Sequence, residues 1–216
     1  MGRVLVYTRT TDYRHDSIPH AVAVLTELLA EQGHVAEHTQ DPASHDAAHL
    51  AGCAAVVWLS TSGDVLDDAG RRGLAEWLAA GGAWAGIHSA TFSEPGWGEF
   101  GRIAGARFLS HPDLQPARLH VADATHPSTA HLPASWVHAD EWYEFGPFEA
   151  ERAVLLTVDE STYTGGSTGD PHPVAWHGAY GRGRTWYTSL GHEAATYDEP
   201  WFRAHLAGGL RSVLAG

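Results

Sequence analysis

Short runs of apolar residues alternate with segments of helical periodicity over the first hundred positions of the chain. Runs with the length and content of buried strands occur at residues 4–8, 34–38, 54–59 and 83–87. Between them, apolar side chains recur every three or four positions, which predicts helices over residues 17–33 and 67–80. This alternation predicts a parallel sheet with right-handed crossovers, and hence a doubly wound α/β fold.

Residues that favour helix ends support both helices. Ser17 is placed to cap the first helix, Pro19 falls in its first turn, where a missing N–H costs little, and Gly33 ends the periodicity. In the second helix, Gly81 and Gly82 follow the last apolar position and end the element. Both helices therefore have defined limits in the sequence.

The middle of the chain lacks helical periodicity. Short segments separated by Pro, Gly and His predict strands over residues 107–109, 117–121, 136–145 and 154–158. We interpret them as an antiparallel insertion in, or extension of, the main sheet. Strands over 173–177 and 184–189 return to that sheet through the turn 180–183, and Asp198 is placed to cap a final helix. One domain covering residues 1–216 is predicted.

The chain is strongly acidic and has no lysine. Its 13 basic residues are all arginine, against 26 Asp and Glu, so the formal net charge is −13 with histidine neutral. Because this charge repels phosphate and anionic lipid, and the arginines are scattered singly, we expect neither a nucleic-acid nor a membrane partner. We expect a small-molecule partner, with a symmetric homodimer as the commonest assembly of such chains.

The single cysteine excludes several kinds of cysteine-based site. One thiol excludes an internal disulfide framework, a four-cysteine zinc site and an iron–sulfur cluster. The chain starts on its first predicted strand, with neither a signal-peptide pattern nor a run of about 18 apolar residues. These features predict a cytoplasmic protein.

Polar side chains follow four strands of the predicted parallel sheet. The loops carry Arg14 with His15, residues 60–62, His88 with Ser89, and His192. His15, His88 and His192 are far apart in sequence, but the carboxyl ends of parallel strands meet at one edge, so we expect them around one pocket. Imidazoles there shuttle protons near neutral pH or bind metal. Other histidines, including His45 and His205, are interpreted as solvated surface residues.

His88 is the strongest single candidate. It directly follows a buried strand, with Ser89 beside it, in a context that resembles the sharp turn that lifts a nucleophile above the sheet in acyl-transfer enzymes. Ser89 paired with His192 as a nucleophile stays open, although no G-x-S-x-G spacing supports it. Cys53 lies before the third strand, at the opposite end of the sheet, and is interpreted as a small buried residue.

The motif Asp140-Glu141-Trp142-Tyr143 places two carboxylates beside two aromatic rings. Glu141 is the expected partner of the histidines, and the rings suit stacking on a sugar. Alternatively, Trp142 packs in the core. His111 adds a further imidazole, unless it only forms a proline turn. Because Asp140 and Glu141 are adjacent on a predicted strand, they point to opposite faces, and the paired carboxylates of common glycosidases are not favoured.

A metal site is a further possibility, although no cofactor is certain. The chain has no H-E-x-x-H pair, so a site would be assembled across loops. A divalent ion such as zinc would draw its ligands from His15, His88, His111, Glu141 and His192. Motifs for dinucleotides and nucleoside triphosphates do not occur.

Six ordered motifs resemble the ThuA-like family of trehalose-utilisation proteins, which shares the fold of class I glutamine amidotransferases. The motifs are Arg14-His15-Asp16-Ser17-Ile18, residues 81–90, Phe108 with His111-Pro112, Asp140-Glu141-Trp142-Tyr143, Pro173-Val174-Ala175-Trp176, and Tyr180-Gly181-Arg182-Gly183-Arg184 with residues 187–192. The resemblance implies a flavodoxin-like sheet and a link to disaccharide or keto-sugar metabolism, and family members are often labelled glycosyl hydrolases. His88 stands where an amidotransferase has its catalytic cysteine, so glutamine hydrolysis is not implied.

These features predict an enzyme acting on a disaccharide or keto-sugar derivative by hydrolysis or isomerisation. The predicted acid/base groups or metal ligands are His88, His192, Glu141 and His15. The predicted substrate contacts are Arg14, Ser89, His111, Trp142 and Tyr143. One alternative is a non-catalytic sugar-binding or sensing protein with the same pocket. Another is a redox or proteolytic protein that uses Cys53, which predicts sensitivity to thiol alkylation.

Overall fold

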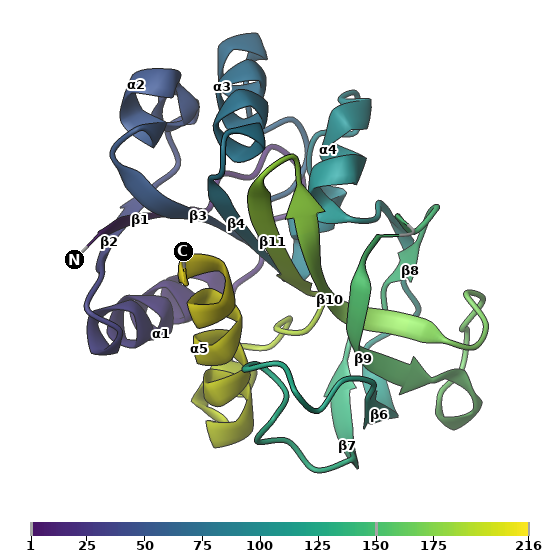
Figure 1. The fold of residues 1–216 in the computed structure, drawn as a ribbon. Coiled ribbons are helices and arrows are strands. Elements are labelled where there is room, and N and C mark those ends of the chain that lie inside the picture. Colours follow the sequence, from purple (N-terminus) through teal and green to yellow (C-terminus); the bar gives the residue numbers. More distant parts are fainter. Residues whose placement is uncertain (1, 150, 216) are drawn as a thin grey trace.

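The computed structural model describes residues 2–149 and 151–215, and within them a nine-stranded sheet carries helices on both faces (Figure 1). The strand order is β2-β1-β3-β4-β11-β10-β9-β6-β7. These strands are β1 (Arg3–Tyr7), β2 (Val35–Thr39), β3 (Cys53–Leu59), β4 (Ala83–Ile87), β6 (Gln115–Val121), β7 (Ser135–Asp140), β9 (Ala153–Asp159), β10 (His172–Tyr180) and β11 (Gly183–Thr188). A separate two-stranded sheet pairs β5 (Phe108–Ser110) with β8 (Glu144–Phe145).

The sheet has a parallel half and an antiparallel half. Strands β2, β1, β3, β4 and β11 are parallel neighbours. From β11 onward, β10, β9, β6 and β7 each pair antiparallel with the strand before them in the order. The predicted α/β class is confirmed. In the middle of the chain, β6, β7 and β9 extend the main sheet, whereas β5 and β8 form the small separate sheet.

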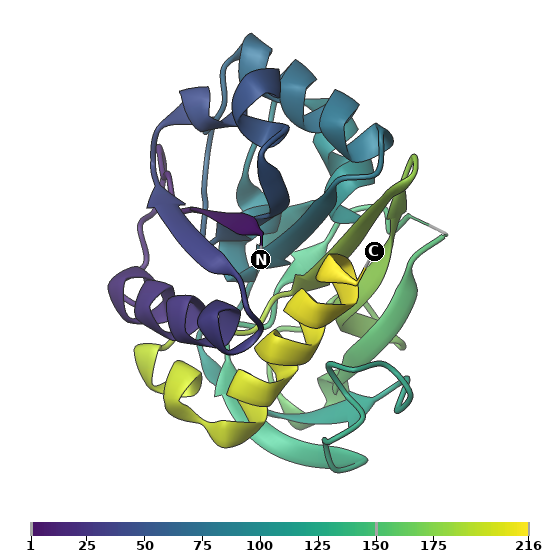
Figure 2. The ribbon, with the colours of Figure 1, turned by 60° about the vertical axis from the view of Figure 1, so that its left-hand side comes forward.

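Helices cover the two faces of the parallel half. One face carries α1 (Ile18–Glu31) and α5 (Pro200–Leu214), which lie side by side (Figure 2). The other carries α2 (Ala47–Leu50), α3 (Asp68–Ala79) and α4 (Gly98–Ala104). Single 3₁₀ turns add η1 (Pro42–His45), η2 (His88–Phe92), η3 (Glu160–Thr162) and η4 (Ala194–Asp198). The parallel half is thus a layer between two helical layers, which explains its continuous apolar strands.

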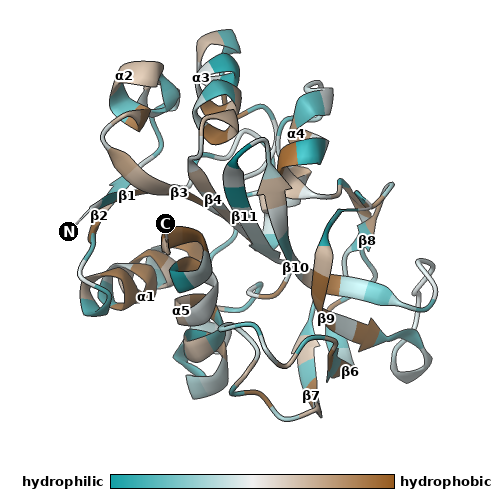
Figure 3. Cartoon of the chain, in the orientation of Figure 1, coloured by the Kyte–Doolittle hydropathy of each residue, from teal (hydrophilic) through white to brown (hydrophobic). Residues whose placement is uncertain are grey.

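The strands β1, β3, β4 and β11 send alternate side chains into two cores. In β1, Val4 and Val6 pack in the core beneath α1 and α5, with Leu25 of α1. Leu5 and Tyr7 point to the opposite face and pack in the second core. Hydrophobic residues accordingly gather on β3 and on the inner sides of the helices (Figure 3). Period-two alternation on a sheet covered on both sides produces this division.

Some predicted boundaries are wrong, for identifiable local reasons. The strand expected over 136–145 is broken, because the Asp140 carboxylate accepts a hydrogen bond from the N–H of Glu141 and the chain leaves the sheet there. Asp198 does not cap the last helix: its carboxylate lies 2.8 Å from Nε2 of His20, and Glu199 takes the N-cap position. Helices α2 and α4 were not predicted, since both are only four to seven residues long.

The helices of residues 2–149 and 151–215 include none that is long and apolar enough to cross a bilayer. The longest helix, α5, has 15 residues, fewer than the roughly 20 that a membrane span needs.

His45 and His205 are fully buried, which corrects their interpretation as surface residues. His45 accepts a hydrogen bond at Nε2 from the indole of Trp58, at 3.0 Å, and Nδ1 of His205 lies 2.8 Å from the carbonyl of Ser128. Burial lowers the pKa of His45 to about 3 and that of His205 to about 4. Both rings are therefore neutral in the folded protein at physiological pH.

We expect the free energy of unfolding to fall as the pH drops from about 6.5 toward 4. The unfolded chain, in which histidine has a pKa of about 6.5, binds protons there that the buried rings do not, so stability is complete above pH 6.5 and is lost below it. At pH 5 the loss is roughly 1–2 kcal/mol for each buried histidine. Urea denaturation at a series of pH values measures it.

The variant His205→Asn isolates one of these groups, because its amide keeps the donor to Ser128 but does not titrate. Its unfolding free energy should depend less steeply on pH than that of the parent. The matched control is His131→Asn at an exposed histidine, which should follow the parent. If the unfolding free energies of His205→Asn and the parent depend equally on pH, the inference that buried His205 is neutral in the folded protein is wrong.

Candidate functional site

Three histidines meet at the carboxyl ends of the parallel strands. His15 follows β1, His88 directly follows β4, and His192 follows β11. The ring centroids of His15 and His88 are 4.4 Å apart, those of His15 and His192 are 5.2 Å apart, and those of His88 and His192 are 5.4 Å apart. The convergence expected from the sheet topology is observed.

Glu141, from the segment between β7 and β8, joins these imidazoles. Its Oε2 lies 3.5 Å from Nε2 of His88 and 3.1 Å from Nδ1 of His192. We refer to four residues as the His–Glu cluster: His15, His88, Glu141 and His192. One donor atom from each lies within 4.8 Å of the other three, so the set is able to hold a single metal ion.

His88 is held in a fixed orientation at the centre of the cluster. Its side chain is completely buried, and Nδ1 lies 2.7 Å from the carbonyl oxygen of Ser189, to which it donates. The opposite nitrogen, Nε2, lies 2.9 Å from Nε2 of His15. The backbone of His88 has φ of 54°, a left-handed conformation that costs energy in a residue other than glycine. Such strain is typical of functional positions.

Asp140 anchors the loop that carries His192, a role that the sequence analysis missed. This fully buried carboxylate accepts hydrogen bonds from the N–H groups of Gly191, at 2.8 Å, and Glu141, also at 2.8 Å. The N–H of His192 lies 3.3 Å from the same carboxylate. Asp140 therefore ties the end of β7 to the loop after β11. The only feature of the sequence that could have indicated this role is that Asp140 is adjacent to Glu141.

The charges in the cluster are unevenly distributed. Burial and the neighbouring His88 and His192 lower the pKa of His15 to about 3, so this ring is neutral. Burial acts to raise the pKa of Glu141, but contacts with His192 and His88 outweigh it and hold that pKa well below its usual range. The contact with Glu141 in turn raises the pKa of His192. The cluster thus combines an ion pair with a neutral imidazole.

Tyr143 contributes a neutral phenol to the same place. Its hydroxyl lies 2.9 Å from Nε2 of His88. Burial, together with the charge of Glu141, raises the pKa of Tyr143 well above its ordinary value. The hydroxyl therefore keeps its proton at physiological pH and is able to donate it in a hydrogen bond.

A cavity of about 380 Å³ opens in front of the cluster. It is lined by Tyr13, His15, Ser89, Phe92, Phe108, His111, Glu141 and Tyr143. The ring centroids of Phe108 and Tyr143 are 4.6 Å apart, and those of Phe92 and Phe108 are 5.0 Å apart. The cavity therefore has an aromatic wall facing a polar end, an arrangement common to small-molecule sites.

Comparison with known proteins identifies the family. The family profile ThuA, described as trehalose utilisation, matches residues 3–212. The chain belongs to the ThuA family. Membership links it to carbohydrate metabolism. A search of curated proteins finds no match.

Solved structures show the same fold as this ThuA chain. A ThuA-like protein from Bacteroides uniformis is 22% identical, with 98% of this chain and 91% of that chain covered and a TM-score of 0.83. One from Parabacteroides merdae is also 22% identical, with 99% and 90% covered and a TM-score of 0.82. A protein from Thermoplasma acidophilum described as part of a GMP synthase is 13% identical, with 100% and 98% covered and a TM-score of 0.57.

Two predicted substrate contacts of the ThuA chain lie away from the cavity. Trp142 is completely buried in the core, where its indole N–H donates to the carbonyl of Gln115 at 2.9 Å. Arg14 donates to the carbonyl of Thr8 at 2.9 Å and does not line the cavity. The geometry supports the alternative core role for Trp142 and a loop-bracing role for Arg14.

The remaining predicted residues divide between cavity lining and other positions. Ser89, His111 and Tyr143 line the cavity. His111 approaches Glu141 only to 3.7 Å and lies outside the His–Glu cluster. The Oγ of Ser89 lies 3.4 Å from His15 rather than beside His192, so the alternative Ser89–His192 pair has no geometric support.

Cys53 is remote from the site. It is the first residue of β3, whereas the His–Glu cluster lies at the opposite ends of the parallel strands, and burial raises the pKa of its thiol. Thiol chemistry therefore has no geometric support at the cavity. The aromatic residues Tyr13, Phe92 and Phe108 were not predicted to line the site, because no rule of sequence spacing brings the loop after β1, η2 and β5 together.

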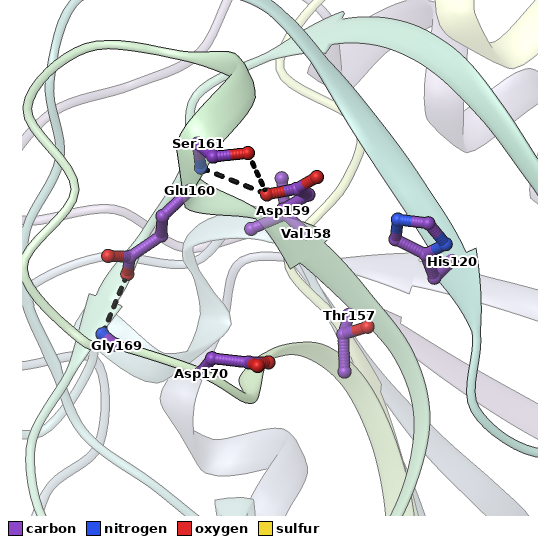
Figure 4. Close-up of a pocket in the computed structure, with 8 residues that line it drawn as sticks. All are labelled: His120, Thr157, Val158, Asp159, Glu160, Ser161, Gly169 and Asp170. Carbon is purple, nitrogen blue, oxygen red and sulfur yellow. Dashed lines mark hydrogen bonds between the residues drawn. The ribbon is translucent and has the colours of Figure 1, made fainter.

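A second cavity, of about 500 Å³, lies beside β9 and shares no lining residue with the first (Figure 4). Two of the carboxylates that line it, those of Asp159 and Glu160, already have backbone partners. Asp159 accepts from the N–H and hydroxyl of Ser161, and Glu160 accepts from the N–H of Gly169 at 2.9 Å. These contacts shape the loop between β9 and β10, so the chemistry favours the cavity at the His–Glu cluster.

Proposed function

We propose that this ThuA chain is an enzyme that acts on a disaccharide or keto-sugar derivative, by hydrolysis or isomerisation, at the His–Glu cluster. One observation carries the proposal: three imidazoles and a carboxylate from four separate segments meet at the polar end of an aromatic-lined cavity. A fold does not assemble such a set for stability, because burying several polar groups costs free energy that apolar residues would not.

The groups present suit proton transfer. His192 and Glu141 form an ion pair in which the imidazolium is a proton donor, and the neutral His15 is a proton acceptor. Tyr143 offers a hydroxyl that keeps its proton and hydrogen-bonds a sugar oxygen. Hydrolysis and isomerisation both require one proton to be removed and one to be delivered, and each well-placed group contributes about 10²–10⁴-fold.

The cavity suits a sugar. Its volume of about 380 Å³ lies near the lower end of the roughly 300–1,000 Å³ usual for small-molecule sites, which matches one or two sugar rings. The half-buried ring of Phe108 offers a stacking surface for the apolar side of a pyranose, and Ser89 and Glu141 offer hydrogen-bond partners for hydroxyl groups. An uncharged ligand is also consistent with the net charge of −13.

Glutamine hydrolysis is not part of the proposal. His88 follows β4 at the position where the resemblance places a catalytic cysteine, and Cys53 lies at the far end of β3. The alternative function is sugar binding without turnover, because an aromatic wall serves binding equally well. Turnover assays separate the two.

The test is a panel of disaccharides, aldoses and keto-sugars, with binding followed by intrinsic fluorescence and turnover by NMR. We expect at least one sugar to bind and to be converted. The variant Phe108→Ala should weaken binding about tenfold, since it removes part of the aromatic wall. The control Leu109→Ala alters the next residue, which is 63% exposed and does not line the cavity. Binding without conversion supports the alternative, and no binding to any sugar refutes both.

A further inference from the structure

We propose that the His–Glu cluster binds one divalent transition-metal ion of the zinc or manganese class. The inference rests on the proposed function only in placing the ion at the same site, and it names the cofactor of that site. The four donor atoms are three imidazole nitrogens and one carboxylate oxygen, which all lie within 4.8 Å of one another.

The orientation of His88 favours an ion. Nδ1 of His88 donates to the carbonyl of Ser189, which leaves Nε2 facing into the cluster. Both Nε2 of His15 and the hydroxyl of Tyr143 lie 2.9 Å from that nitrogen. The inward nitrogens of His15 and His88 therefore face each other across a short gap. An ion between them would accept the lone pairs of both rings.

The spacing of the donors matches a shared ion. Two nitrogens bound to one ion at about 2.1 Å lie about 3.0 Å apart at a right angle and about 3.4 Å apart at the tetrahedral angle. The observed separations are 2.9 Å between the nitrogens of His15 and His88, 3.1 Å from His192 to Glu141, and 3.5 Å from His88 to Glu141. All three fall in or close to this range.

Hydrogen bonds with outer residues hold the cluster in the way that they hold metal ligands in other proteins. The carbonyl of Ser189 fixes the tautomer of His88 and turns Nε2 inward. Asp140 holds the backbone of both Glu141 and His192. Such outer contacts orient ligating side chains and raise their affinity for the ion.

The charge of the site also calls for a cation. The adjacent carboxylates of Asp140 and Glu141 are paired only with histidines in residues 2–149 and 151–215, and no arginine side chain forms an ion pair with either. A dication bound at the cluster takes the place of the proton that His192 holds beside Glu141, and it neutralises both carboxylates. Three nitrogen donors select a transition metal over Mg²⁺ or Ca²⁺, which prefer oxygen ligands throughout.

A second group of ligand-type residues shows the contrast. Glu144, Glu160 and His172 also lie close together. However, Glu160 accepts from the N–H groups of Thr168 and Gly169, and Glu144 accepts from that of Ser167. These carboxylates hold a loop, so their oxygens are already engaged and no ion is inferred there.

The test is metal binding by the full chain, purified without an affinity tag and stripped with a chelator. We expect titration calorimetry to show about one equivalent of Zn²⁺ or Mn²⁺ and none of Mg²⁺. His15→Ala and His192→Ala should weaken Zn²⁺ binding about 100-fold or more, since even outer contacts to metal ligands are worth about 10–100-fold. The matched control is His111→Ala, which lines the same cavity outside the cluster and should bind as the parent does.

Cobalt provides a readout independent of activity. Co²⁺ added to the stripped parent should give visible absorption bands that Glu141→Gln alters and His111→Ala does not. If the parent takes up neither Zn²⁺ nor Co²⁺ at micromolar concentration, or if the cluster variants bind like the parent, the metal site is wrong. Sugar conversion by a protein that takes up neither Zn²⁺ nor Co²⁺ would overturn the ion but keep the proposed function. A tightly bound ion in a protein that binds no sugar would keep the metal site but refute the proposed function.

Discussion

Replacing His88 with asparagine is expected to lower kcat for the converted sugar by about 10²–10⁴-fold, with a much smaller change in KM. The reason is the geometry of one nitrogen. Nε2 of His88 meets both His15 and Tyr143 at 2.9 Å, and asparagine has no atom there. The lining of the cavity in which we propose that the sugar binds, in contrast, does not include His88, so binding should largely survive.

Asparagine is chosen because it separates chemistry from folding. It tolerates the left-handed backbone at φ of 54° better than alanine does, and its amide N–H reaches the carbonyl of Ser189 in place of Nδ1. His88→Ala adds a cost of about 1–2 kcal/mol for that backbone conformation. The control is His120→Ala, which alters an imidazole in the second cavity and should leave kcat unchanged. A His88→Asn protein with the kcat of the parent would remove His88 from the mechanism.

The parallel half of the sheet could be predicted from the sequence because several of its strands are each marked by a run of apolar residues. Strands covered on both faces must be apolar throughout, so β1 and β4 stand out as short apolar runs. The break between β7 and β8 could not be predicted in the same way. It depends on the side chain of Asp140, whose other partners, Gly191 and His192, lie about fifty positions away in the chain.

The same distinction applies to the site. The meeting of His15, His88 and His192 follows from topology, since all three lie after parallel strands. The aromatic wall does not follow from it, because Phe92 ends η2 and Phe108 begins β5, whose place depends on its pairing with β8. Topology predicts where strands end, but it does not predict how the loops beyond them fold back.

Asp140→Asn tests whether the site depends on a residue that does not line the cavity. The carboxylate is completely buried and accepts from the N–H groups of Gly191, His192 and Glu141. An amide in its place turns one oxygen into a donor that faces other donors. We expect a loss of about 3 kcal/mol in unfolding free energy, because breaking a buried charged network is strongly destabilising. For a chain of this length the thermal midpoint should fall by roughly 6–12 °C.

The effect on activity distinguishes positioning from stability alone. Without Asp140, the loop that carries His192 is no longer tied to Glu141, and a displacement of about 1 Å costs on the order of 10²-fold in rate. Measured well below the unfolding transition, kcat should therefore fall about 100-fold while KM changes little. Asp159→Asn is the matched control, since that carboxylate also accepts a backbone N–H, at 2.9 Å from Ser161, but at an exposed position. If Asp140→Asn loses stability yet keeps the parental kcat, Asp140 supports the fold only, and the orientation of His192 must come from its contact with Glu141.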